Sequence, residues 1–329
     1  MKKIFGPILI IMLTSLLPGF AVNAQQSQTA GDECDRSCLI NMVDAYLLAL
    51  VKHDPASVPI ADNARFVENI KPILPGAGLW KNAVQVPTAF RIYVPDPVSQ
   101  QVGFFGVMLA KVSVEDTQEV KPILLALRLQ LNNGHITEME HLIAGNLGER
   151  NLPNLIVPRK ALLTAIPEPD RMSRDELLMA GARYYDALAG DNGSLAPFAD
   201  DCIRRENGIQ TTNNPPPKAG ETGLALFGAM GCAKQLDTHI MSYIDRIDDR
   251  RVQIADVETG LVFGLSHFHH SMKNKTIKII GVPGVTERIM TNNPFDLPAA
   301  HIYKISGGKI HEIEAMGFVA PYNSMSGWE

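Results

Sequence analysis

Two histidines separated by one residue are the first candidates for acid–base chemistry in this sequence. His267 and His269 lie in an apolar segment, 260–270, that alternates like a β-strand and places both imidazoles on one face. Such a pair can act as acid and base or share a metal ion. A zinc site needs a third ligand that the local sequence does not supply, and His239 and Asp237 qualify only if folding brings them near. We therefore assign no metal, and the alternative is a packed or solvated histidine strand, perhaps at a domain interface.

The segment Arg205-Glu206-Asn207-Gly208 is the second candidate. A carboxylate beside an amide can serve as a general base with an orienting donor, and burial in an apolar cavity would raise its pKa. The pair Glu68-Asn69 repeats the motif earlier in the chain. Glu-Asn-Gly is also turn chemistry, and its recurrence favours a structural role over a catalytic one.

Aromatic and basic side chains supply the remaining candidates for a ligand pocket. Tyr243 could donate a hydrogen bond to a developing oxyanion, from what reads as a charge-dense strand. Trp80 precedes a segment that contains Arg91 and Tyr93, and these three side chains could line a pocket for a ring-shaped ligand or simply pack. His239 is a further candidate for substrate contact.

Charge and motif content exclude several classes of function. The chain of 329 residues has 30 Lys and Arg against 35 Asp and Glu, a net charge of −5, and shows no basic patch for nucleic acid. It contains no G-x-G-x-x-G, P-loop, H-E-x-x-H or G-x-S-x-G motif. We therefore predict no cofactor, and any catalysis is expected to be cofactor-free.

The first 24 residues have the pattern of a secretory signal. Two lysines precede an apolar core, residues 9–17, and Val22-Asn23-Ala24 suits a signal peptidase. The apolar core is shorter than the roughly 20 residues that a membrane span needs. The pattern predicts a periplasmic or secreted protein with no membrane anchor after cleavage.

Four cysteines, Cys34, Cys38, Cys202 and Cys232, lie in the remaining chain. An even number in an oxidising compartment indicates two disulfides, with three possible pairings. We expect Cys34–Cys38 and Cys202–Cys232, because each pair then stays within one repeat.

An internal repeat sets the organisation of the chain. Tyr46–Leu50 matches Tyr184–Leu188, and Glu68-Asn69 matches Glu206-Asn207, both at an offset of 138 residues. A later match, 133–140 with 307–314, has an offset of 174, so the second copy carries 36 extra residues, in 211–223 or 272–298. We predict a signal peptide at 1–24, a first domain at 25–150, a proline-rich linker at 151–172 and a second domain at 173–329.

Each copy begins with an amphipathic helix and continues as strands. Ser173 and Glu176 predict a capping box for the second helix. Apolar and β-branched segments predict strands at 90–94, 102–109 and 124–131 in the first copy, and at 252–255, 261–269 and 301–305 in the second. Asn132-Asn133-Gly134 and Gly307-Gly308 predict the last hairpin turn of each copy. The class is α+β, with a helix layer on a curved antiparallel sheet, twice.

The helix-then-hairpins order, ending in a strand of Ile-x-Glu-x-Glu type, resembles the nuclear transport factor 2-like (SnoaL-like) superfamily. Residues 34–39, His53-Asp54-Pro55, Gly78-Leu79-Trp80 and 205–208 also resemble a family of secreted bacterial and fungal proteins of uncharacterised function. The superfamily resemblance implies two tandem cone-shaped domains, each with a pocket between helix and sheet. Its members include isomerases, dehydratases, cyclases and non-catalytic proteins without one shared catalytic motif, so no catalytic residue is carried over.

These observations lead to two functional hypotheses. The first is a cofactor-free lyase, isomerase or dehydratase for a small apolar or aromatic metabolite, in which His267, His269, Glu206 or Tyr243 would transfer protons. The alternative is a non-catalytic small-molecule-binding or scaffold protein. In both, the expected partner is a small molecule, and the two domains pair within the chain or form a homodimer.

Overall fold

The computed structural model describes residues 33–114, 117–218, 220 and 223–329, so the predicted signal peptide lies outside the described residues. The first half contains α1 (Arg36–Lys52), β1 (Ile60–Glu68), β2 (Lys71–Pro72), α2 (Leu79–Asn82), β3 (Ala83–Gln85), β4 (Arg91–Asp96), β5 (Gln101–Val114), β6 (Thr117–Asn132) and β7 (His135–Ala144). A linker with α3 (Lys160–Leu163) follows. The second half contains α4 (Arg174–Ala189), β8 (Phe198–Glu206), β9 (Ile209–Gln210), α5 (Leu224–Gly228), α6 (Cys232–Leu236), β10 (Arg246–Asp256), β11 (Leu261–His270), β12 (Thr276–Lys278), β13 (Glu287–Ile289), β14 (Phe295–Ser306), β15 (Lys309–Gly317) and β16 (Ala320–Pro321).

The two long helices form where the apolar spacing predicts them. Leu39, Val43 and Leu50 are among the buried residues of α1, one face of the helix that packs on the first sheet. Asp35 caps the start of α1 by accepting a hydrogen bond from the backbone of Cys38. The capping box predicted at Ser173 is confirmed at the start of α4.

Each half has one main sheet, and the two sheets share one strand order. The first sheet runs β2-β1-β7-β6-β5, with β4 and β3 on β5, and the second runs β9-β8-β15-β14-β11-β10. The prediction of purely antiparallel sheets is wrong for one pair in each, because β1 is parallel to β7 and β8 is parallel to β15. Strands β1 and β8 were not predicted, since a register irregularity and several polar residues interrupt their alternation.

The register shows where the second half is longer. Glu68 pairs with His141 in the first sheet, as Glu206 pairs with Ala315 in the second. The offset between matching positions is 138 residues at β1 and β8, 160 at β5 and β11, and 174 at β6 and β14. The first 22 extra residues therefore enter between β8 and β11, where α6 lies, and the other 14 form the β12–β13 hairpin region. Both predicted insertion segments are used.

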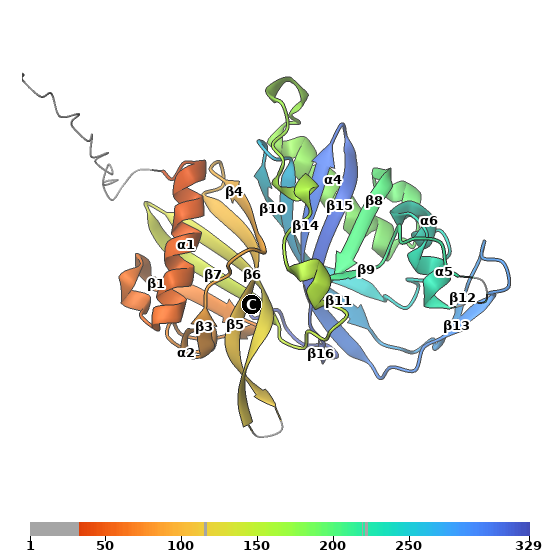
Figure 1. Cartoon of the computed structure of the whole chain (residues 1–329), viewed down its shortest axis with the longest axis horizontal. Coiled ribbons are helices and arrows are strands. Elements are labelled where there is room, and N and C mark those ends of the chain that lie inside the picture. Colours follow the sequence, from red (N-terminus) through yellow and green to blue (C-terminus); the bar gives the residue numbers. More distant parts are fainter. Residues whose placement is uncertain (1–32, 115–116, 219, 221–222) are drawn as a thin grey trace, which may run out of the picture.

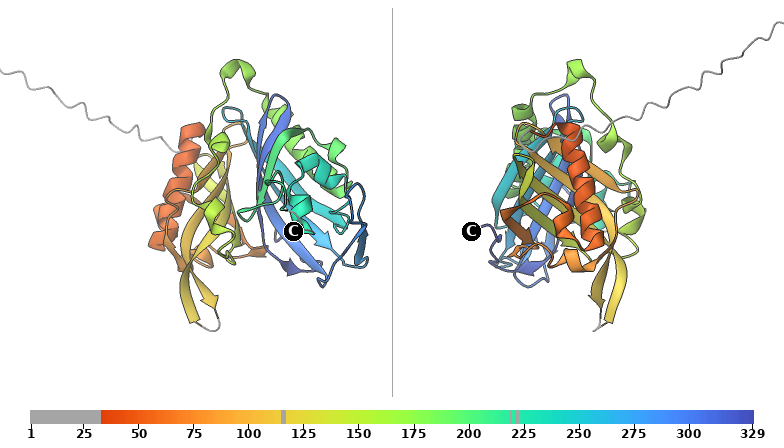
Figure 2. Two further views of the ribbon diagram at one scale, coloured as in Figure 1. Left: turned by 45° about the vertical axis from the view of Figure 1, so that its right-hand side comes forward. Right: turned by 90° about the vertical axis from the view of Figure 1, so that its left-hand side faces the viewer.

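The two sheets pack face to face, with α1 and α4 on the outer sides, so the molecule has four layers (Figures 1 and 2). The core between the sheets includes Phe105 and Leu124 from the first half and Phe263 and Ile302 from the second. Gly103 has no side chain where the Phe263 ring lies, since a Cβ there would be 2.3 Å from that ring. This close approach is what glycine permits.

Both predicted disulfides, Cys34–Cys38 and Cys202–Cys232, are present. The first lies at the start of α1, and the second joins β8 to α6. Within the described ranges, no helix combines the length and the apolar character that a membrane crossing requires. The domain boundaries stay a prediction.

Candidate functional site

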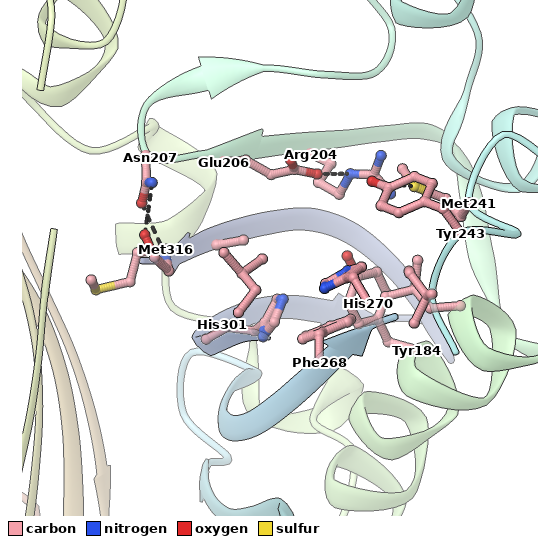
Figure 3. Close-up of a pocket in the computed structure, with 16 residues that line it drawn as sticks. Tyr184, Arg204, Glu206, Asn207, Met241, Tyr243, Phe268, His270, His301 and Met316 are labelled. Atoms are coloured by element: carbon pink, nitrogen blue, oxygen red, sulfur yellow. Dashed lines mark hydrogen bonds and ion pairs between the residues drawn. The ribbon is translucent and has the colours of Figure 1, made fainter. Parts of the chain in front are cut away.

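A cavity of about 200 Å³ lies inside the second half, between α4, the strands β8, β11, β14 and β15, and the turn that precedes β10 (Figure 3). Its apolar wall includes Leu188, Met241, Phe268, Leu297, Ala299 and Ala315. Its polar wall is formed by Tyr184, Arg204, Glu206, Tyr243, His270 and His301. The volume is slightly larger than a cavity that accepts benzene, so it suits a ligand of about one ring.

The matching positions in the first half are filled by packed side chains. The register pairs Arg204 with Phe66, His301 with Leu127, and His270 with Ala110. Those three first-half residues are buried, and Phe66 and Leu127 belong to its apolar core. Polar groups in the second half thus replace core residues of the first.

A histidine closes the space in the first half. His141 occupies the position of Ala315, and its ring nitrogens bond the Tyr46 hydroxyl at 2.9 Å and Glu68 at 3.0 Å. The Trp80 ring packs edge-on against Tyr46, with 5.1 Å between ring centroids. The small side chain of Ala315 leaves this volume open in the second half.

His301 is buried among aromatic rings at the cavity wall. Its Nδ1 lies 3.0 Å from the Tyr185 hydroxyl, and no hydrogen bond among the described residues takes Nε2. Burial, reinforced by the charge of Arg204, lowers the pKa of His301 to about 3. The imidazole is therefore neutral at neutral pH, and with the proton on Nδ1 its Nε2 offers a lone pair to a ligand.

His270 is the second neutral histidine of the cavity. It is stacked between Tyr243, at 5.4 Å between centroids, and Phe295, at 4.2 Å. Burial lowers the pKa of His270 to about 4, and its Nδ1 is buried without a hydrogen-bond partner. A buried polar atom without a partner costs stability, which a ligand group could recover.

Arg204 brings a buried positive charge to the same cavity. Its Nε donates to Thr211 at 3.0 Å and lies 2.9 Å from the Glu206 carboxylate, and its terminal nitrogen donates to Gln235. Burial raises the pKa values of Tyr184 and Tyr243, so both phenols stay protonated as donors. The cavity thus combines neutral imidazoles with a cation and hydroxyl donors.

Three residues singled out in the sequence reach this cavity: Glu206, Asn207 and Tyr243. The Glu206 side chain is 49% exposed, so it lacks the burial that a general base in an apolar pocket would need. Asn207 holds the turn after β8 through hydrogen bonds with the backbone of Gly317, at 2.9 and 3.1 Å. Tyr243 lies in a turn before β10 and not on the predicted strand, because β10 begins at Arg246.

His267 and His269 do not line the cavity. They share one face of β11 as predicted, but the neighbouring residues Phe268 and His270, on the other face, reach the pocket. Both histidines contact Asp296 on the face that looks toward the first half. This is the arrangement that disfavours a catalytic role for them in the pocket.

The other candidates in the second half also lie elsewhere. His239 bonds Asp191 at 2.7 Å, away from the cavity lining, and Arg205 lies on the outer side of β8, where it donates to the backbone of Asn154.

The candidates from the first half hold that half together. Trp80 is buried in its core, and Glu68 accepts a hydrogen bond from the backbone of Leu79 at 3.0 Å. Arg91 and the Tyr93 hydroxyl both bond Asp44 of α1, at 3.2 and 2.6 Å. These contacts join helix to sheet, and none of the four side chains lines the second-half cavity.

Comparison with known proteins adds a family for the second half. A family model described as "Domain of unknown function (DUF8021)" matches residues 170–317. No curated protein matches the chain at a significant level.

Among solved structures, the chain is similar to two proteins described as "putative" polyketide cyclases. One, from Xanthomonas campestris pv. campestris, is 17% identical, with 44% of this chain and 90% of that chain covered and a TM-score of 0.28. The other, described as SnoaL-like, from Jannaschia sp. CCS1, is 11% identical, with coverages of 46% and 90% and a TM-score of 0.26. An NTF-2 like protein of unknown function from Burkholderia xenovorans LB400 is 13% identical, with coverages of 47% and 90% and a TM-score of 0.25. The likeness to NTF2-like and SnoaL-like proteins is the one that the sequence indicated, and it carries no argument about function.

Proposed function

We propose that the second half binds a small metabolite of about one ring and transfers a proton on it without a cofactor, as an isomerase or lyase. The observation that supports this most is the exchange of core side chains for polar ones between the halves. Arg204 and His301 stand where Phe66 and Leu127 pack in the first half. Buried polar groups cost stability unless they are used, so their presence around an open cavity favours a ligand.

The proposed reaction starts with a ligand carbonyl held by Arg204 and the Tyr184 hydroxyl. Nε2 of His301 takes a proton from the adjacent carbon, and the electron pair moves onto the oxygen, whose charge Arg204 balances. The same imidazole returns the proton at a different carbon in an isomerisation. His270 is the second group that can exchange a proton with the ligand.

Deuterium exchange tests this step. The mature chain is mixed in D₂O with one-ring ketones and enones, and NMR follows deuterium entry at the carbon next to the carbonyl. We expect exchange with the wild type and at least a 100-fold loss with His301→Leu, which restores the first-half residue. His311→Ala is the control, because His311 lies outside the cavity and pairs with Asp201. Exchange that persists in His301→Leu would rule out the proposed base.

The second candidate function is binding without chemistry. It is favoured by the Glu206 carboxylate, which balances the charge of Arg204 at 2.9 Å and so weakens its pull on an oxyanion. The same experiment separates the two functions: a ligand that binds wild type, shifts its NMR signals and acquires no deuterium identifies a binding protein.

We also propose that the chain works in the periplasm or outside the cell. Two disulfides support this, because such bonds persist in oxidising compartments.

A further inference from the structure

Two histidines and an aspartate converge on the face of β11 opposite the cavity. His269 pairs across the sheet with Asp296 of β14, and His267 lies two residues before it on the same face. Asp296 Oδ1 is 2.8 Å from His269 Nδ1, and Oδ2 is 3.3 Å from His267 Nε2. All three residues are buried, and their ligand atoms lie within 4.8 Å of one another.

We propose that these three side chains bind a divalent transition-metal ion of the zinc class, with a fourth position left for an exchangeable ligand. Zinc with three protein ligands takes imidazole nitrogens and a carboxylate oxygen at about 2.0–2.2 Å, which separates the donor atoms by roughly 3.3 Å. The separation of His267 and Asp296 already has this value. The site is independent of the proposed proton transfer, since it lies on the other face of the strand.

The second nitrogen of His269 supports a metal over a network of hydrogen bonds alone. Nε2 lies 3.3 Å from the Asp248 carboxylate, while Nδ1 faces Asp296. Hydrogen bonding on both sides would require a doubly protonated, buried imidazole. A metal bonded to Nδ1 instead leaves Nε2–H to donate to Asp248, and metal-bound histidines commonly have such an outer carboxylate. A divalent ion also balances the two carboxylates.

The surroundings leave room for the fourth ligand and an entry path. A cavity of about 20 Å³, enough for one water, borders His267 between the two halves. Ser324 of the C-terminal segment closes the other side, with its backbone N–H 2.8 Å from Asp296 and its hydroxyl 3.2 Å from His267. Asp248 is 48% exposed, so the site lies close to solvent.

The first half lacks this set of donors. The register places Val107, Leu109 and Pro122 at the positions of His267, His269 and Asp296. None of these three side chains can bind a metal. The two halves therefore provide an internal comparison: the expected stoichiometry is one ion per chain and not two.

Metal titration tests the proposal. The full mature chain is stripped with a chelator and titrated with Zn²⁺ and, separately, Co²⁺, with bound metal measured by mass spectrometry and binding by calorimetry. We expect about one equivalent of either ion, a rise in Tm on adding Zn²⁺, and at least a 100-fold weaker affinity in His269→Ala and Asp296→Asn. His311→Ala, which breaks an exposed His–Asp pair, is the matched control and should bind as wild type does.

Two results would overturn the proposal: wild type that binds less than a tenth of an equivalent, or His311→Ala losing as much affinity as His269→Ala. Should a variant fail to fold, as judged by circular dichroism, the Co²⁺ complex of the wild type decides. The strong visible absorption of four-coordinate cobalt supports the site, and only the weak absorption of the hydrated ion contradicts it. Loss of deuterium exchange in His301→Leu with intact metal binding would keep the two sites distinct.

Discussion

The two cavity histidines are kept neutral by burial, and this links the site to pH. Burial lowers the pKa values of His301 and His270 to about 3 and about 4, against 6.5 for an exposed imidazole. In the unfolded chain both rings take up a proton below pH 6.5, while in the folded chain they do not. Acid therefore favours the unfolded state between pH 6.5 and about 4.

We predict a measurable pH effect at His301. Each histidine that stays neutral on folding costs up to about 1.4 kcal/mol per pH unit below 6.5. Lowering the pH from 7 to 5 should therefore reduce the free energy of unfolding of the wild type by about 2 kcal/mol more than that of His301→Leu. Urea unfolding at the two pH values measures this. Equal losses in both proteins would mean that His301 is not held neutral.

Ion pairs at the ends of equivalent elements join the two halves. Arg36 at the start of α1 bonds Asp256 at the end of β10, at 2.8 Å, and Arg174 at the start of α4 bonds Asp96 at the end of β4, at 2.9 Å. Each aspartate is nearly fully buried. The contacts are reciprocal, as at an interface with two-fold symmetry.

Removing one side of such a pair should be costly. Arg174→Ala leaves the Asp96 carboxylate buried beside the backbone N–H of Ala255, without its cation. We expect a loss of about 3 kcal/mol. The matched control is Arg246→Ala, since Arg246 pairs with Asp248 where both side chains are about half exposed, and its loss should be under about 1 kcal/mol. Chemical unfolding compares them, and similar values for the two variants would contradict this account of the interface.

The strand elements also show what sequence could and could not predict. The long helices and the central strands were predicted because their apolar spacing is regular over many residues. Asp296 was missed as a partner of His269, because the two meet only through the pairing of β11 with β14 across a 24-residue connection.

The cavity was half predicted. Tyr243 was found as a single residue, whereas His301 was assigned only to a strand. Aligning the repeats along every strand, instead of one, would have shown a histidine where the first copy has Leu127. The exchange of His141 for Ala315, which opens the cavity, is visible only with the same alignment.

At the scale of the molecule, each half is covered by the segment that follows the last strand of the other. The linker after β7 places Asn151 and Arg159 on the second half, where Arg159 pairs with Glu314 at 3.0 Å. The segment after β15 places Trp328 on the first half, with the guanidinium groups of Arg65 and Arg128 at 4.8 and 5.0 Å from its ring. The two segments strap the halves together.

We therefore predict that Trp328→Ala weakens the whole molecule. The change removes the packed indole and its contacts with the surrounding arginines, which include Arg251 at 5.6 Å. We expect a loss of about 2 kcal/mol in unfolding free energy. Met325→Ala is the control, because Met325 is in the same segment and is 64% exposed, and it should change stability by less than about 0.5 kcal/mol. If both variants unfold like the wild type, the C-terminal segment does not act as a strap.

The central claim is that the second-half cavity is the functional site, and histidine NMR tests it most directly. The chain is labelled with ¹⁵N in its histidine rings, the signals are assigned with single variants, and one-ring ketones and phenols are added at neutral pH. We predict that a ligand shifts the ring signals of His301 and His270 and leaves those of His141 and His311 unchanged. Ligands that shift only histidines outside the cavity, or that bind equally well to His301→Leu, would contradict the account.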